Sequence, residues 1–293
     1  MIRRYDTISF LSDYGTADEF VGVVHSVVRD IAPHATVIDL THQVPPFDVR
    51  AGSLTLARCI SYVPSGVVLA VVDPGVGTDR KAVAVEVADG EGVIVGPDNG
   101  LIAPAVAMAG GAGRAVLLTN EEYHLGAAGA TFAGRDVFAP AAAHLCNGVD
   151  LYELGEPIEA DLLMPAVIPI AQEEAGVMLG EVLWVDRFGN CQLNVSPAEV
   201  EHWGDRIRVS VGDRAAPTVR AAKLVANYAE IGTGGVGLVV DSYGMLALSL
   251  DRRSAAEELG IGAGDQVVLM PIPDDDLGDT RGTTSPVTLR SAR

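Results

Sequence analysis

The chain has 293 residues, of which 48% are hydrophobic and 20% charged, and its formal net charge is −19. These proportions are those of a globular protein long enough for one large or two ordinary domains. The negative charge argues against nucleic acid and anionic membranes as partners, because both carry the same sign. No apolar run reaches the roughly 18 residues that a membrane span needs.

The three cysteines, Cys59, Cys146 and Cys191, are widely spaced and form no CxxC motif. This usage predicts neither a disulfide framework nor a zinc site, and it indicates a cytoplasmic protein. The first residues, "MIRRYDTISF", contain no apolar signal core.

The first half of the chain alternates strand and helix patterns. We expect strands at residues 7–12, 35–40, 66–72 and 115–119, a strand pair within 82–96, and helices at 18–32, 48–63, 101–109 and 135–148. Continuous Val, Ile and Leu strands between helices indicate a mostly parallel sheet covered on both faces. The sequence therefore predicts an α/β domain over residues 1–165.

The second half has a different pattern. Short strand-like segments follow one another between Gly and Asp residues, as in "GEVLWVDRFGNCQLNV" and "VGLVVDSYGMLALSLD". This pattern predicts a smaller β domain, a barrel or a sandwich, over residues 175–272. Residues 273–293 are polar and lack periodicity, which predicts a disordered tail.

Three strands of the first half end on or near a carboxylate: Asp13, Asp39 and Asp73. In open α/β sheets, ligands bind beyond the carboxyl ends of the strands, so we expect these three side chains on one rim. The alternative is that they start turns or cap helices. Asp13 is also suited to chelate a ribose diol through two hydrogen bonds.

The segment "VVDPGVGTDR" runs from an apolar strand through Pro74, Gly75 and Gly77 to Arg80. Proline fixes φ and the glycines let the backbone turn closely, so Arg80 can return to pair with Asp73. A carboxylate paired with arginine stays ionised and can orient a water by accepting its proton. The alternative is an Asp–Arg pair that braces a loop.

Several common sites are not indicated. The sequence has no GxGxxG, no P-loop lysine and no GxSxG. The histidines lack HExxH or other ligand spacing, so we expect no metal in catalysis.

Seven segments, in order, resemble those of the S-adenosyl-L-methionine (SAM) hydroxide adenosyltransferases, which are SAM hydrolases related to the SAM-dependent fluorinase and chlorinase. They are "SDYGTADEFVG", "PPFDVRAG", "VVDPGVGTDR", "GPDNG", "TFAGRDVFAPAAAHL", "VDRFGNCQLNV" and "DSYGMLALS". The resemblance covers about residues 7–270. It implies an α/β domain followed by a β-barrel, and homotrimers whose sites lie between the N-domain of one subunit and the C-domain of the next.

The resemblance also implies a reaction, in which SAM and water give adenosine and L-methionine without metal or cofactor. Asp73 and Arg80 match two members of the Asp–Arg–His set that holds the attacking water. An acidic residue at position 73 suits water and repels a halide, which favours a hydrolase over a halogenase. For the nucleoside, the resemblance implies that Asp13 binds the ribose diol and that Phe47 packs on the nucleoside. It implies that Asp186, Phe188 and Asn190 hold the methionine amine and the adenine, and that Ser242 contacts the methionine carboxylate. Arg252, Ser254 and Ala255 are expected beside the adenine edge.

One position departs from the family pattern. The family has histidine where this chain has Ala133, in "TFAGRD". Either this is a natural variant or an inactivating substitution made to trap substrate, and the intact Asp73 and Arg80 favour the second. Loss of one general acid–base group costs roughly 10²–10⁴ in rate, so we expect binding with slow turnover. The alternatives are a SAM-dependent 5′-halogenase and a non-catalytic SAM or adenosine sensor.

Overall fold

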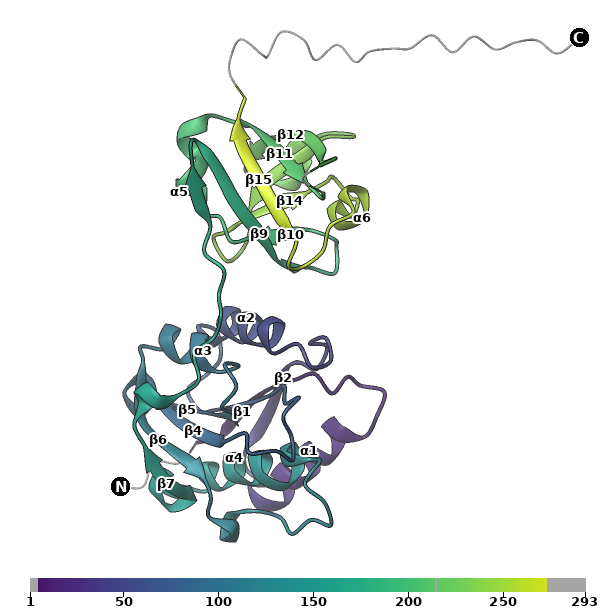
Figure 1. The fold of residues 1–293 in the computed structure, drawn as a ribbon. Coiled ribbons are helices and arrows are strands. Elements are labelled where there is room, and N and C mark those ends of the chain that lie inside the picture. Colours follow the sequence, from purple (N-terminus) through teal and green to yellow (C-terminus); the bar gives the residue numbers. More distant parts are fainter. Residues whose placement is uncertain (1–4, 214, 273–293) are drawn as a thin grey trace, which may run out of the picture. The chain divides into compact units, whose positions relative to one another are not determined.

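The computed structural model describes residues 5–213 and 215–272 (Figure 1). The chain divides between Ile168 and Pro169 into two compact units. The expected tail, 273–293, lies outside the described residues.

The first unit contains a seven-stranded sheet in the order β2-β1-β3-β5-β4-β6-β7. Five strands run in one direction and β4 and β7 run against them. The strands are β1 (Thr7–Ser12), β2 (Thr36–Thr41), β3 (Val67–Val71), β4 (Ala82–Val87), β5 (Gly92–Pro97), β6 (Ala112–Leu118) and β7 (Gly155–Ile158). The mostly parallel sheet expected from the sequence is thus confirmed.

Helices cover both faces of this sheet. The main helices are α1 (Phe20–Ile31), α2 (Val49–Ile60), α3 (Ala103–Met108) and α4 (Ala139–Cys146), and α4 follows directly on a π-helical turn, η3 (Gly134–Phe138). Helices α1 and α4 pack on one face and α2 and α3 on the other, each pair with its own buried apolar cluster (Figure 1). Short 3₁₀ helices complete the unit: η1 (Ala88–Gly90), η2 (Glu121–Tyr123), η4 (Leu151–Leu154) and η5 (Ala160–Leu162).

The chain reverses its winding direction at β1. Helix α1 leads from β1 to β2 at one edge, and α2 leads from β2 across β1 to β3. The carboxyl ends of β1 and β3 therefore flank a topological switch point, where open α/β sheets bind their ligands. Asp13 and Asp73 follow these two strands.

The second unit is a closed barrel of seven strands in the order β10-β14-β13-β12-β11-β15-β9, closed by pairing of β9 with β10, with β8 added to β9. A buried apolar cluster fills the barrel. Along β9 and β11 every second residue is buried, because alternate side chains point into the barrel. The strands are β8 (Gln172–Glu174), β9 (Val177–Val185), β10 (Cys191–Leu193), β11 (Arg206–Val211), β12 (Thr218–Val225), β13 (Val236–Val240), β14 (Leu246–Ser249) and β15 (Gln266–Pro271). The helices are α5 (Pro197–Val200), η6 (Glu201–Trp203), η7 (Tyr228–Ile231) and α6 (Ala255–Leu259).

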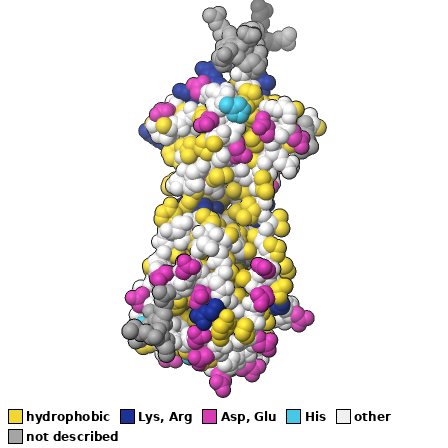
Figure 2. All heavy atoms as spheres, turned by 90° about the vertical axis from the view of Figure 1, so that its left-hand side faces the viewer, with side chains coloured by type: hydrophobic (Ala, Val, Ile, Leu, Met, Phe, Trp, Pro, Cys, Tyr) yellow, Lys and Arg dark blue, Asp and Glu magenta, His cyan; other side chains and the backbone are white. Residues whose placement is uncertain are grey.

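The surface reflects the composition. Figure 2 shows acidic side chains spread over one face of both units, with few basic ones among them, as the net charge of −19 requires. Among the described residues no helix is long and apolar enough to cross a membrane.

Candidate active site

Asp73 and Arg80 form a two-pronged ion pair at the carboxyl end of β3. Arg80 donates from Nε to Asp73 Oδ1 at 2.9 Å and from Nη2 to Oδ2 at 2.5 Å. Both side chains are largely buried, at 12% and 6% exposure. The guanidinium also lies over the ring of the buried Phe138, 5.2 Å from its centroid. This packing fixes the orientation of both charged groups.

The loop from Asp73 to Arg80 is shaped by its own hydrogen bonds. Thr78 Oγ1 donates to the Gly75 carbonyl at 2.6 Å and accepts from the Arg80 backbone N–H at 3.3 Å. Gly77 has φ +78°, which favours glycine, and a Cβ on Gly75 would lie 3.3 Å from Arg80 Cβ. The glycines thus allow Arg80 to fold back onto Asp73, as the sequence predicted.

The proton affinity of the paired Asp73 is raised, which we did not expect. Burial raises the pKa of the Asp73 carboxyl, and this effect exceeds the opposing hydrogen bonds and charge of Arg80. The raised pKa makes the Asp73 carboxylate a stronger proton acceptor than an ordinary aspartate.

Asp13 lies beside this pair, after β1. Its backbone N–H donates to the Val71 carbonyl at 3.4 Å, which places it at the end of β3 as well. Asp13 Oδ2 accepts the Phe47 backbone N–H at 2.9 Å, and no hydrogen bond from the described residues is recorded for Oδ1. Phe47 has φ +69° and is 73% exposed. A positive φ is strained for phenylalanine, and such strain is most frequent at functional sites.

Tyr14 was not identified as a site residue from the sequence. Burial, then the charges of Asp13 and Asp73, raise the pKa of its hydroxyl, so it stays neutral. A Cβ on Gly134 would lie 2.1 Å from the Tyr14 hydroxyl oxygen, so this hydroxyl lies against the residue that follows Ala133. The available signal was the position of Tyr14 directly after Asp13 within the motif.

Ala133 is the residue before η3 and shares a pocket with Arg80. This pocket, of about 340 Å³, is also lined by Gly77, Thr78 and Ala130. A longer side chain at position 133 therefore has space toward the Asp73–Arg80 loop.

Asp39 does not join Asp13 and Asp73. It lies inside β2, two residues before the strand ends, and its carboxylate is within 2.9 Å of His25 and His42. The expectation of a shared rim therefore holds for Asp13 and Asp73 and not for Asp39.

In the second unit, Asp186 closes the turn after β9. Its Oδ1 accepts the backbone N–H groups of Phe188 and Asn190, at 2.8 and 2.9 Å, and its Oδ2 accepts Asn190 Nδ2 at 2.7 Å. Phe188, at the tip, is 77% exposed. The turn thus presents an acidic and an amide group beside an exposed aromatic ring.

A second turn of the same design follows β13. Asp241 Oδ1 accepts the backbone N–H groups of Tyr243 and Met245, at 2.8 and 3.1 Å, and Oδ2 accepts Gln192 Nε2. Ser242 lies in this turn and lines a pocket of about 400 Å³ with Asp186 and Asn190. The structure thus brings these three predicted residues together.

A larger pocket, of about 670 Å³, adjoins the first turn. It is lined by Asp186, Phe188, Asn190, Tyr228, Ala229, Leu250, Asp251, Arg252, Arg253 and Ser254. Tyr228 lines both pockets of this unit and was not expected, because nothing in its local sequence marks it.

Two of the residues expected beside adenine also have structural roles. The side chain of Ala255 is fully buried in the barrel core, so only its backbone is available to a ligand. Ser254 Oγ caps α6 by accepting the Glu257 N–H at 3.1 Å. Arg252, by contrast, is 92% exposed with φ +52°.

Two family models match the chain: the SAM hydroxide adenosyltransferase N-terminal domain at residues 8–155, and its C-terminal domain at 180–268. A Salinispora tropica protein named (R)-S-adenosyl-L-methionine hydrolase is 43% identical over 260 residues, 89% of this chain and 96% of that protein. A fluorinase from an Actinoplanes species is more distant, at 25% identity over 286 residues, 88% of this chain and 95% of the relative.

A solved structure of an uncharacterized conserved protein from Thermotoga maritima is similar, with a TM-score of 0.81 and 32% identity. The alignment covers 90% of this chain and 99% of that one. The order of the two domains, the strand-end motifs and these matches lead to one conclusion. The chain belongs to the SAM hydroxide adenosyltransferase family.

Proposed function

We propose that this protein is a SAM hydrolase, which converts SAM and water to adenosine and L-methionine. The observation that carries the proposal is the buried Asp73 carboxylate, held in place by Arg80 at the switch point beside Asp13. The name of the Salinispora tropica relative gives the same activity.

The chemistry requires little beyond positioning. The water oxygen forms a bond to the ribose 5′ carbon while the bond from that carbon to sulfur breaks, and its electron pair leaves with the sulfur as the methionine thioether. The proton that the water loses goes to Asp73, whose raised pKa suits it to accept one. Because the sulfonium is already a good leaving group, the protein orients the water and excludes bulk solvent. The proposed reaction uses no metal and no cofactor.

The remaining residues are proposed to bind the substrate. Asp13 holds the ribose diol, using the carboxylate oxygen that is not engaged by Phe47, and the ring of Phe47 packs on the nucleoside. In the second unit, Asp186 and Asn190 bind the methionine ammonium and Ser242 the methionine carboxylate. Phe188, Arg252, Ser254 and the backbone of Ala255 lie along the adenine.

We propose that the complete site forms between subunits of a homotrimer, with the first unit of one copy facing the second unit of the next. Two observations support this arrangement. The binding residues are divided between the two units, and each set includes a large exposed aromatic side chain, Phe47 or Phe188. We further propose a cytoplasmic location, consistent with the free thiols of the three cysteines.

Mixing two inactive variants tests the shared site. Asp73→Asn disables the first-unit half and Asp186→Asn the second-unit half, and the two are co-expressed at equal levels in the Ala133→His background. If each site uses two subunits, about a quarter of the sites contain two intact halves and activity returns to that extent. If the mixture is as inactive as each variant alone, the shared site is excluded.

The Ala133→His variant tests the proposed activity itself. The chain and the variant are incubated with SAM, and adenosine and methionine are separated by chromatography. We expect the variant to be faster by roughly 10²–10⁴, the usual contribution of one acid–base group. Ala130→His is the matched control, because Ala130 lines the same pocket. An unchanged rate in Ala133→His would contradict the assignment of position 133.

One alternative has a specific observation in its favour. The alanine at position 133 is also what a SAM or adenosine sensor without catalysis would carry. Such a sensor binds adenosine tightly and gains no hydrolysis from Ala133→His. A 5′-halogenase is disfavoured by the carboxylate of Asp73, and formation of 5′-chloroadenosine in chloride would be required to support it.

A further inference from the structure

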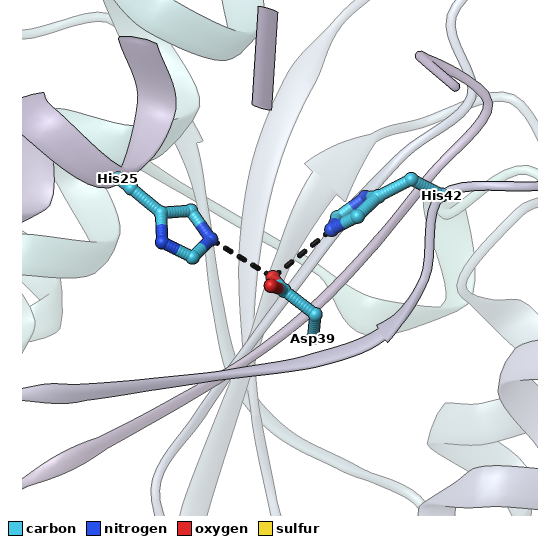
Figure 3. Close-up of side chains that lie close together, drawn as sticks. All are labelled: His25, Asp39 and His42. Carbon is cyan, nitrogen blue, oxygen red and sulfur yellow. Dashed lines mark hydrogen bonds and ion pairs between the residues drawn. The ribbon is translucent and has the colours of Figure 1, made fainter. Parts of the chain in front are cut away.

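Three side chains from separate elements meet near the switch point, on the side of β2. His25 lies on α1, Asp39 within β2, and His42 just after β2 (Figure 3). The Nε2 atoms of both histidines lie 2.9 Å from the same atom, Asp39 Oδ1. All three candidate ligand atoms lie within 4.8 Å of one another. The sequence spacing does not predict this cluster. His25 lies 14 residues before Asp39 and His42 lies 3 residues after it, and the three come from different elements.

His42 is the unusual member. It is 6% exposed, and its Nδ1 lies 2.7 Å from Ser12 Oγ. Its Nε2 is buried and lies 2.9 Å from Asp39 Oδ1. The two atoms are poorly aligned, so Nε2 has no hydrogen-bond partner among the described residues. When Nδ1–H donates to Ser12, Nε2 presents a lone pair toward the carboxylate. A cation between them removes this repulsion and satisfies the buried nitrogen.

We propose that His25 Nε2, His42 Nε2 and Asp39 Oδ1 bind one divalent transition-metal ion, with zinc as the preferred ion. Two imidazoles and a carboxylate form a common zinc ligand set, which leaves one position for water. Ligands at about 2.0–2.2 Å in a tetrahedral site are separated by roughly 3.3 Å. The two 2.9 Å separations to Asp39 Oδ1 therefore need to open by a few tenths of an ångström, and the two Nε2 atoms, which lie within 4.8 Å of each other, need to reach the same separation.

The surroundings suit a bound cation. The side chains of His25 and Asp39 are 36% and 43% exposed, so an ion can enter from solvent, while His42 forms the buried floor. Arg29, one helical turn after His25, directs its Nη1 to the Pro33 carbonyl at 2.5 Å. The Ser12 hydroxyl supports His42 from behind, as outer hydrogen bonds do in metal sites.

The proposed ion has a structural role and takes no part in the hydrolysis step. Ser12 directly precedes Asp13, and the His42 carbonyl accepts the Gly15 N–H at 2.7 Å. Both sides of the Asp13 turn are thus tied to His42. An ion that fixes His42 also fixes the segment that carries Asp13.

The test uses the full chain without a histidine tag, treated with a chelator and titrated with Zn²⁺ or Co²⁺ in the absence of SAM. We expect one equivalent to bind, a rise in Tm, and for Co²⁺ the intense visible absorption of a four-coordinate site. Affinity falls toward acidic pH, because protons compete for the imidazoles.

Variants assign the binding to these residues. His25→Gln and the isosteric Asp39→Asn are each expected to weaken Zn²⁺ binding by at least about tenfold, and Ser12→Ala by roughly 10–100-fold through loss of the outer hydrogen bond. His202→Gln, at an exposed histidine outside the cluster, is the matched control. The proposal is overturned if no stoichiometric binding occurs, or if His25→Gln and Asp39→Asn bind Zn²⁺ as well as this control does. Neither result depends on whether the chain hydrolyses SAM.

Discussion

The guanidinium of Arg80 holds the carboxylate of Asp73 through two hydrogen bonds, at 2.9 and 2.5 Å, with the ring of Phe138 behind it. The six residues between the pair form a tight turn at the end of β3. Both groups are buried, so their orientation is set before any substrate arrives. Preorganised groups of this kind contribute most to catalysis, since no energy is spent in aligning them during the reaction.

The rate of SAM hydrolysis is expected to fall at acidic pH as Asp73 becomes protonated, because a protonated carboxyl cannot accept the proton of water. Burial raises the pKa of Asp73 above its ordinary value of 3.8, so the acid limb lies above that value. The measurement is the pH–rate profile of the chain with Ala133, in which no histidine at this position adds a second titration.

Arg80→Gln is expected to move this acid limb to higher pH. The hydrogen bond and the charge of Arg80 both lower the pKa of Asp73, so removing them leaves burial unopposed. Lys81→Gln is the control, because it removes a neighbouring positive charge that is not among the main influences on the pKa of Asp73. A limb that stays in place or moves to lower pH in Arg80→Gln excludes the proposed coupling.

Asp13→Asn is expected to weaken adenosine binding by roughly 10- to 150-fold, since a hydrogen bond to a charged group contributes roughly 1.5–3 kcal/mol. If Asp13 binds the ribose diol, the loss is much smaller for 2′-deoxyadenosine, which lacks one hydroxyl. Calorimetry of both ligands with both proteins gives a double-mutant cycle. Equal losses for the two ligands would show that Asp13 acts through its hydrogen bond to Phe47 instead.

Gly189→Ala is expected to destabilise the second unit by about 1–3 kcal/mol through strain at positive φ and a steric clash. Gly189 has φ +82°, and a Cβ there would lie 2.1 Å from Ser254 Oγ. Gly244→Ala is the matched control, because its φ is also +82° and nothing lies within 4 Å of its added Cβ. Urea unfolding measures both, and equal losses would show that the contact with Ser254 is unimportant.

The elements of the fold were predictable because each has a clear local pattern. Buried strands such as β3 are continuous apolar runs, and the glycines of the turn from Asp73 to Arg80 let Arg80 pair with Asp73. The sequence predicted that α1 begins at residue 18, two residues before its observed start at Phe20. Glu19 is the N-cap and makes no side-chain capping hydrogen bond.

The site was predictable where one motif contains both partners and less so where partners come from distant elements. Asp39 has the position of a strand-end carboxylate in the sequence, yet its neighbours His25 and His42 determine its surroundings. The raised pKa of Asp73 depends on burial, which the local sequence does not reveal. Tyr228 reaches its pockets only through the folding of the barrel.

The central claim is that Asp73 directs a water to the 5′ carbon of SAM, and hydrolysis in ¹⁸O-labelled water tests it most directly. The Ala133→His variant is compared with the same variant carrying Asp73→Asn, and the adenosine is analysed by mass spectrometry. The account predicts ¹⁸O in the 5′ hydroxyl, and a rate about 10²–10⁴ lower with Asp73→Asn. Adenosine without the label, or an unchanged rate in Asp73→Asn, would contradict it.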